Sequence, residues 1–308
     1  MASRTLAYVL GGGGARGALQ AGALRALWEA GYRPDFAVGT SIGALNAACL
    51  GLYGADEAGL AALEQAWRDA AQADLLPANY LWLTIRTLFG RGGGHLEERM
   101  RAFLIEHGLT PELRFADLPG IPIYLVAADL NSGRPVLYGD DPNQRVMEGV
   151  LASCALPPWV HPLNVGDRLL VDGGAVSNLP IEAALARGAG EIIALDISEP
   201  AGTLPNDSTF GPWINKLSRT INQRQLDLEL ALAAALNVPV RRLWLRFHQP
   251  VPVWDFSHTE ELIAAGYAQA RAEIATWQAA QPSRLRNLRS RLSRLNVWSG
   301  GRPRFHAR

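Results

Sequence analysis

The sequence has few of the residues and patterns that mark disulfide-rich, secreted or membrane-spanning proteins. Its two cysteines, Cys49 and Cys154, each lie in an apolar neighbourhood, so we expect reduced core thiols and a reducing compartment. No run approaches the roughly 18 apolar residues of a membrane-spanning helix, and no signal-peptide pattern begins the chain. Basic and acidic residues both number 29, which argues against general nucleic-acid binding. We predict a cytoplasmic protein whose membrane contact is peripheral, at the inner face.

Metal-binding patterns are also missing. None of the histidines has the spacing of a metal site, and no ligand cluster is typical of calcium: His95, His107, His161, His248, His258 and His306. We therefore predict neither a metal nor a cofactor.

Apolar segments of strand length alternate with helical patterns along the chain. A strand at 5–10, a helix at 18–30 and a strand at 36–38 are typical of a parallel sheet with helices on both faces. Apolar residues make up 48% of the chain and can fill one large core, so we predict one domain at 1–281 and a basic amphipathic tail at 282–308. Further strands are predicted at 121–128, 135–138, 168–171, 191–197 and 241–247, and helices at 42–50, 58–73, 96–107, 146–154, 180–187, 213–236 and 259–278.

Ser41 lies in the pattern Gly39-Thr40-Ser41-Ile42-Gly43, between a short apolar strand and an Ala- and Leu-rich helix. This pattern is typical of a nucleophilic serine on a strained strand-to-helix turn. Gly39 and Gly43 leave room for the strand and the helix to approach closely. The hydroxyl then lies at a helix N-terminus, where partial positive charge favours a developing anion.

A glycine loop, Gly12-Gly13-Gly14-Ala15-Arg16-Gly17, follows the first strand and has two interpretations. It fits a dinucleotide-binding loop, but Asp35 precedes the second strand, whereas a ribose-binding acid belongs at that strand's far end. It also fits an oxyanion hole, in which backbone N–H groups converge without side-chain obstruction. Arg16 would hold the loop or contact an anionic head group.

A nucleophilic serine needs a base at the same edge of the sheet. Asp172 ends an apolar strand and is followed by Gly173-Gly174, which places its carboxylate at a strand end. A free aspartate has a pKa near ~3.9 and is a weak base, so desolvation would have to raise that pKa. A turn-capping role is the simpler alternative for Asp172. His248 follows a late strand, as the base of a Ser-Asp-His hydrolase would, but Gln249-Pro250 after it is typical of an edge strand's end.

Four ordered blocks resemble the patatin-like phospholipases: Gly12 to Gly17, Gly39 to Gly43, Ala152-Ser153-Cys154-Ala155-Leu156-Pro157, and Asp172 to Gly174. The resemblance covers about Leu6 to Ile197; beyond it, Asp255-Phe256 and Gly266-Tyr267 are loosely similar. It implies a three-layer α/β/α fold and a Ser-Asp dyad that works without histidine. By the same resemblance Ser41 is the nucleophile, Asp172 the general base, and the amides of Gly12, Gly13 and Gly14 the oxyanion hole. Gly11 stands where many members carry aspartate.

The expected substrate is a phospholipid, a lysophospholipid or a related acyl ester. Two stretches could contact a membrane: the apolar 79–89, which is either a lid or a packed helix, and the basic amphipathic 282–298. The tail could equally dock on the acidic body of its own or a neighbouring chain, which leaves a homodimer open. A nucleotide-binding oxidoreductase and a non-enzymatic lipid-binding regulator are the alternative functions.

Overall fold

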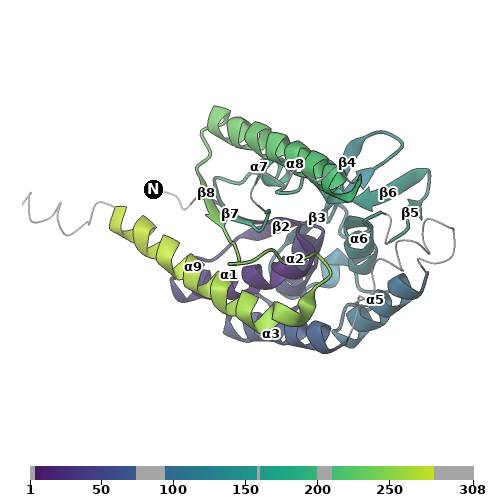
Figure 1. The fold of residues 1–308 in the computed structure, drawn as a ribbon, viewed down its shortest axis with the longest axis horizontal. Helices are drawn as coiled ribbons and strands as arrows, with labels where there is room; N and C mark the ends of the chain where they lie inside the picture. Colours follow the sequence, from purple (N-terminus) through teal and green to yellow (C-terminus); the bar gives the residue numbers. More distant parts are fainter. Residues whose placement is uncertain (1–3, 74–93, 158–159, 200–209, 281–308) are drawn as a thin grey trace, which may run out of the picture. The chain divides into compact units, whose positions relative to one another are not determined.

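The structure is a computed structural model that describes residues 4–73, 94–157, 160–199 and 210–280 (Figure 1). The predicted membrane-contact stretches, 79–89 and 282–298, and the proposed tail lie outside the described residues. Contacts between residues are concentrated within two units of the chain, Met1–Arg271 and Ala272–Arg308. Within the described part, no helix combines the length and the apolar character needed to cross a bilayer.

The centre of the first unit is an eight-stranded sheet in the order β5-β6-β3-β2-β1-β7-β8, with β4 also paired to β3. Strands β3, β2, β1, β7 and β8 are parallel, whereas β4 and β6 run antiparallel to β3, and β5 antiparallel to β6. The predicted mostly parallel sheet is confirmed. The strands are β1 (Leu6–Leu10), β2 (Phe36–Thr40), β3 (Ile123–Asp129), β4 (Arg134–Tyr138), β5 (Leu163–Val165), β6 (Arg168–Asp172), β7 (Glu191–Asp196) and β8 (Val240–Trp244).

Helices cover both faces of this sheet, as expected from its nearly continuous apolar central strands. On one face, Val9, Val38 and Ile192 share a core with Leu226 and Ala233 of α8. Figure 1 shows α7 and α8 on this side and α1, α2 and α3 on the other. The helices are α1 (Gly17–Glu29), α2 (Ile42–Tyr53), α3 (Glu57–Gln72), α5 (Gly94–Glu106), α6 (Val146–Ser153), α7 (Ile181–Ala186), α8 (Phe210–Ala235) and α9 (Thr259–Ala280).

The first turns of α9 pack on α1 through two glycines. A Cβ atom on Gly266 would lie 1.9 Å from the carbonyl oxygen of Leu19, and one on Gly22 would lie 1.9 Å from that of Ile263. Only glycine permits this backbone approach. The segment before α9 is anchored by Phe256, which stacks on Trp67 of α3 at 5.9 Å between ring centroids. These contacts show that the late segment, which resembles the family only loosely, packs against α1 and α3.

Strand β8 is at one edge of the sheet, as predicted for 241–247. Its arginines pair with the neighbouring strand: Arg241 with Glu191, and Arg242 with Asp196. The guanidinium carbons of Arg242 and Arg246 lie 4.9 and 4.4 Å from the ring centroid of Trp244. The edge is therefore lined by guanidinium groups held in place by ion pairs and cation–π contacts.

Candidate active site

Ser41 lies on a strained turn between β2 and α2. Its backbone has φ of 56° and ψ of −126°, a conformation that costs a non-glycine residue about 1–3 kcal/mol. A Cβ atom on Gly39 would lie 2.2 Å from the carbonyl oxygen of Gly43, and one on Gly43 would lie 2.1 Å from that of Leu10. The two glycines therefore allow the close approach of strand and helix that the sequence pattern predicts.

Strand register brings Asp172 beside this turn. Thr40, the last residue of β2, pairs with Val126 of β3, and Asp172 of β6 pairs with the next residue, Ala127. Because β6 is antiparallel to β3, it runs back along the part of β3 that extends beyond β2. Asp172 thus approaches Ser41 from an antiparallel strand, whereas we expected it at the carboxyl edge that parallel strands share.

The Asp172 carboxyl is buried, and burial raises its pKa from 3.8 to about 6. Interaction with the Ser41 hydroxyl and a hydrogen bond from the Gly174 amide, 2.7 Å from Oδ1, lower the pKa and offset part of the increase. The predicted nucleophile and the predicted base are therefore brought together. Near neutral pH the aspartate is ionised and more basic than a free carboxylate.

The glycine loop lies next to the same turn, but its three amides are not equivalent. A Cβ atom on Gly12 would lie 3.0 Å from that of Ser41, and the Gly12 amide donates to the carbonyl oxygen of Asn178 at 3.0 Å. The Gly12 N–H is therefore engaged in this structure, and its place among the oxyanion donors stays a prediction. Among the described residues, the amides of Gly13 and Gly14 meet no hydrogen-bond acceptor, and both glycines are partly exposed.

Arg16 anchors the glycine loop to two distant segments of the chain. Its guanidinium group donates to the carbonyl oxygens of Ile197 and Val251 and forms an ion pair with Glu199 at 3.2 Å. Burial lowers the pKa of Arg16, and the carboxylate of Glu199 opposes this change. Of the two roles that we considered for Arg16, these contacts support the structural one. Gly17 also supports the loop, because a Cβ atom there would lie 2.6 Å from the Trp67 ring.

Buried side-chain amides, linked to each other by a hydrogen bond, support the two ends of the glycine loop. Gln20 donates to the carbonyl oxygen of Gly11 at 2.9 Å, and Asn46 donates to Gln20 at 2.8 Å and to the carbonyl oxygen of Gly17 at 3.1 Å. The indole N–H of Trp67 completes this network by donating to Asn46 at 2.9 Å. Sequence reasoning missed Gln20 and Asn46 because both lie inside apolar helices, where a lone polar residue indicates no particular partner.

Ser153 is a further residue of the site whose role sequence reasoning did not identify. Its buried hydroxyl accepts a hydrogen bond from the Ser41 amide at 2.9 Å and donates one to the carbonyl oxygen of Val126 at 2.5 Å. Ser153 thus connects the strained turn to β3. The four-block resemblance singled out the segment containing it, and the structure supplies the contact.

The residues of the alternative interpretations lie elsewhere. Asp35 accepts from the Leu6 amide at 2.6 Å, at the start of β1, whereas the glycine loop follows the end of that strand. Asp35 is therefore too far from the loop to bind a ribose held there. His248 packs against Phe247, with 4.1 Å between ring centroids. No histidine of the described segments hydrogen-bonds to Ser41 or Asp172, and these segments contain no group of residues suited to a metal ion.

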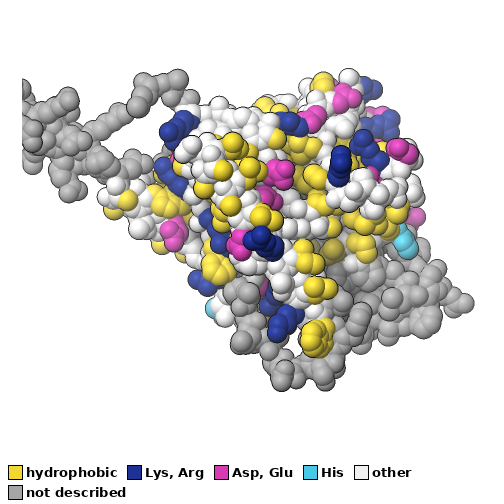
Figure 2. All heavy atoms as spheres, turned by 90° about the horizontal axis from the view of Figure 1, so that it is seen from above, with side chains coloured by type: hydrophobic (Ala, Val, Ile, Leu, Met, Phe, Trp, Pro, Cys, Tyr) yellow, Lys and Arg dark blue, Asp and Glu magenta, His cyan; other side chains and the backbone are white. Residues whose placement is uncertain are grey.

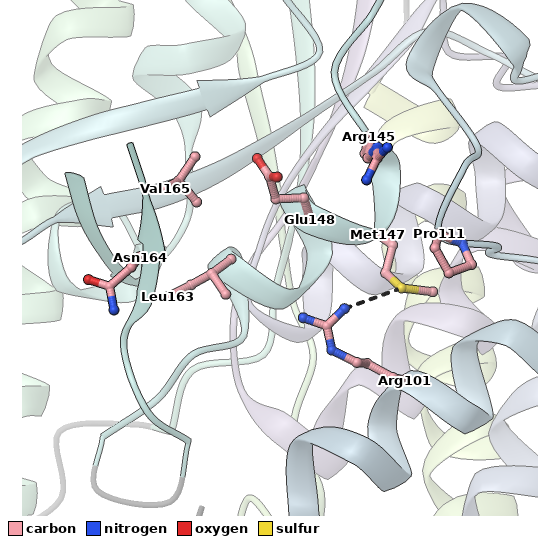
Figure 3. A pocket seen from close by; sticks show the side chains of 8 residues that line it. All are labelled: Arg101, Pro111, Arg145, Met147, Glu148, Leu163, Asn164 and Val165. Carbon is pink, nitrogen blue, oxygen red and sulfur yellow. Dashed lines mark hydrogen bonds between the residues drawn. The ribbon is translucent and has the colours of Figure 1, made fainter. Parts of the chain in front are cut away.

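A separate cavity of about 220 Å³ lies among α5, α6 and β5 (Figure 3). Its arginines are engaged: Arg101 donates to the sulfur of Met147 at 3.8 Å, and Arg145 pairs with Glu112 at 3.2 Å. None of the predicted site residues lines it, so we assign it no part in the chemistry. Its lining is Arg101, Pro111, Arg145, Met147, Glu148, Leu163, Asn164 and Val165.

Together, the sheet order and the strained serine beside a buried aspartate define an α/β protein with a serine on a sharp strand-to-helix turn. Comparison with known families is more specific: the chain belongs to the patatin-like phospholipase family, whose model matches residues 8–185. This match confirms the resemblance of the four sequence blocks.

Known relatives share most of this chain. It is 27% identical over 301 residues to human patatin-like phospholipase domain-containing protein 6, covering 90% of this chain and 21% of that protein. It is 28% identical over 309 residues to an uncharacterized NTE family protein of Mycobacterium tuberculosis, covering 93% and 48%. The chain thus spans about a fifth and about half of these relatives. Among solved structures, VipD from Legionella pneumophila is 15% identical with a TM-score of 0.46, covering 89% of this chain and 67% of VipD.

Substituting Ser153→Ala should loosen the turn at Ser41. The Ser41 amide loses its acceptor and the Val126 carbonyl its donor, so unfolding free energy should fall by about 1–3 kcal/mol. The rate at which Ser41 reacts with a fluorophosphonate should also fall, by about tenfold or more. Thr259→Val is the matched control, because it removes a buried hydroxyl that bonds to Phe256 at the start of α9. It should lower stability without changing that rate; equal effects in both variants would contradict the positioning role.

Asp172→Asn should stabilise the protein at neutral pH. Because the folded-state pKa, about 6, lies above the ordinary 3.8, holding the buried carboxylate ionised costs stability above pH 6, by up to about 3 kcal/mol. This cost declines as the pH falls from 6 toward 3.8. Urea unfolding should therefore show the variant to be more stable at pH 7.5, with a smaller difference at pH 5. A variant that is less stable at both pH values would show that the carboxylate is not strained by burial.

Proposed function

We propose that the protein is a serine acyl hydrolase that cleaves carboxylic ester bonds of phospholipids, lysophospholipids or related acyl esters. The observation that carries this proposal is the placement of the Ser41 hydroxyl against the buried Asp172 carboxyl, whose pKa is raised to about 6. A base with this pKa can accept a proton near neutral pH. Membership of the patatin-like phospholipase family supports a lipid ester as the substrate.

In the proposed mechanism, Asp172 accepts the hydroxyl proton while Ser41 Oγ attacks the ester carbonyl carbon. The resulting tetrahedral intermediate collapses, the alcohol leaves with the proton from Asp172, and an acyl-serine remains. Water then attacks the acyl carbon and loses its proton to Asp172. Ser41 recovers that proton when the carboxylic acid leaves.

The negative charge on the tetrahedral oxygen needs donors that are not already engaged. We assign this role to the amides of Gly13 and Gly14, which lie on the partly exposed side of the loop. The Gly12 amide, bound to Asn178, instead keeps the loop close to the segment that follows Asp172. Arg16, Gln20 and Asn46 hold the loop in place, so that its donors need little rearrangement during the reaction.

The remaining partner assignments stay predictions. Peripheral membrane contact through 79–89 and 282–298, a homodimer and a cytoplasmic location concern features that the described residues do not test. An oxidoreductase function is not supported, because Asp35 is remote from the glycine loop. A non-enzymatic lipid-binding regulator is distinguished from a hydrolase by the experiment below.

Fluorophosphonate labelling, followed together with hydrolysis of a short-chain nitrophenyl ester, tests the two catalytic assignments. Ser41→Ala should abolish both labelling and turnover, because the nucleophile is removed. Asp172→Asn should reduce both by about 10²-fold or more, since the base is lost while the fold remains. Thr259→Val serves as the control with an intact site. Turnover that persists in Ser41→Ala, or a wild-type protein that neither labels nor hydrolyses esters, would contradict the proposal.

The pH dependence of turnover should follow the ionisation of Asp172. Only the carboxylate can accept the serine proton, so kcat/KM should reach a plateau above pH 6 and fall about tenfold per pH unit well below it. Protonation of this buried group favours the folded state, so the loss at low pH should reverse when neutral pH is restored. A profile centred near pH 4 would mean that the base is an ordinary exposed carboxylate.

A further inference from the structure

One face of α8 presents large apolar side chains to solvent. They follow helical spacing over most of the helix, whereas Leu226, Glu229 and Ala233 on its other face are buried. An exposed apolar strip of this length is unusual for a protein surface and marks an interaction site. The strip, here named the α8 stripe, consists of Trp213, Leu217, Ile221, Leu228 and Leu232, which are 64%, 55%, 45%, 53% and 38% exposed.

Within α8 itself, the charged residues of the first half of the stripe are all basic. From residue 210 to residue 226 the helix has three basic residues and no acidic one. Lys216 and Arg224 are exposed next to the stripe, and Arg219 pairs with Glu199. Figure 2, viewed from the side on which α8 lies in Figure 1, shows hydrophobic side chains interspersed with basic and acidic ones on this face.

The buried side of α8 is bonded to the segments that carry the active site. Gln225 donates to the carbonyl oxygen of Ala175, three residues after Asp172, at 3.0 Å. Glu229 accepts from the Ser177 hydroxyl at 2.5 Å, and the Ser177 carbonyl accepts from the Thr40 hydroxyl, next to Ser41, at 2.8 Å. Any surface that the α8 stripe contacts is therefore held at a fixed position relative to Ser41 and Asp172.

We propose that the α8 stripe is the surface by which the protein docks on anionic lipid. Apolar side chains of this size enter the boundary between head groups and acyl chains, and flanking cations are attracted to anionic head groups. The inference rests on the proposed function for its purpose, which is to bring the catalytic serine to esters that lie in a bilayer. Docking itself requires no turnover.

A second copy of the chain fits the stripe less well. Paired stripes related by a two-fold axis would bring the exposed basic residues of one copy toward those of the other or toward apolar side chains, and the one exposed acidic residue of α8, Asp227, already accepts a hydrogen bond from Gln223. An anionic lipid surface complements both the apolar and the basic parts of this face.

Vesicle co-sedimentation in the inactive Ser41→Ala background tests the proposal. The probes are vesicles of phosphatidylcholine mixed with phosphatidylglycerol and vesicles of phosphatidylcholine alone. Trp213→Ser together with Leu217→Ser should reduce partitioning to the mixed vesicles by about tenfold or more. Lys216→Glu together with Arg224→Glu should remove the preference for mixed vesicles. Ile105→Ser with Leu130→Ser, which removes two exposed apolar side chains elsewhere, is the matched control and should bind like the parent.

Thermal unfolding of each variant and its mass in solution by light scattering accompany the binding measurement. Equal binding by the Trp213/Leu217 variant and the matched control would overturn the proposal. Dissociation of a dimer by that variant, with vesicle binding unchanged, would overturn it in favour of a second copy as the occupant. Because the assay uses inactive protein, its failure is distinct from a failure of the proposed hydrolase function, which the ester and labelling assays report.

Discussion

The arrangement of the site depends on one backbone contact, in which the first turn of α2 packs against the end of β1 with no space for a side chain between them. A Cβ atom on Gly43 would lie 2.1 Å from the carbonyl oxygen of Leu10, so any other residue would push the helix away from the sheet. With the helix this close, the chain must turn sharply at Ser41, and the positive φ there is the result. The same close approach places Ser41 against the glycine loop, which begins at Gly12, two residues after the end of β1.

Strain at a turn persists only where surrounding contacts over-determine it. Here the contacts are polar and buried: Ser153 bonds the turn to β3, and the side chains of Gln20 and Asn46 bond the loop to α1 and α2. Leaving a buried polar group without a hydrogen-bond partner costs free energy, so each of these bonds opposes relaxation of the backbone that it holds. A few buried, hydrogen-bonded side chains thus keep the loop rigid and maintain the strain at the serine that the close approach of α2 to β1 produces.

Most of the fold could be predicted from the sequence, because central strands and long helices have strong apolar periodicity. Strand β5 was missed, since three residues, of which only Leu163 and Val165 are apolar, give too short a pattern. Ser41, Asp172 and the glycine loop were recognisable from local patterns and lie together. The antiparallel return of β6 and the engagement of the Gly12 amide depend on strand pairing between distant segments, and the bonds of Ser153 depend on a partner 112 residues away. No local pattern carries that information.

The arginines of β8 have a consequence for how the protein behaves in a crowded solution. An edge strand presents unpaired backbone groups that can template pairing with a strand from another molecule. On the edge strand β8, Arg241 and Arg242 pair with Glu191 and Asp196 of β7, and the ring of Trp244 lies against guanidinium groups. An incoming strand would have to desolvate these charges or displace them from their partners. The edge is thereby protected against open-ended sheet extension, and its tryptophan is kept from acting as an adhesive contact between molecules.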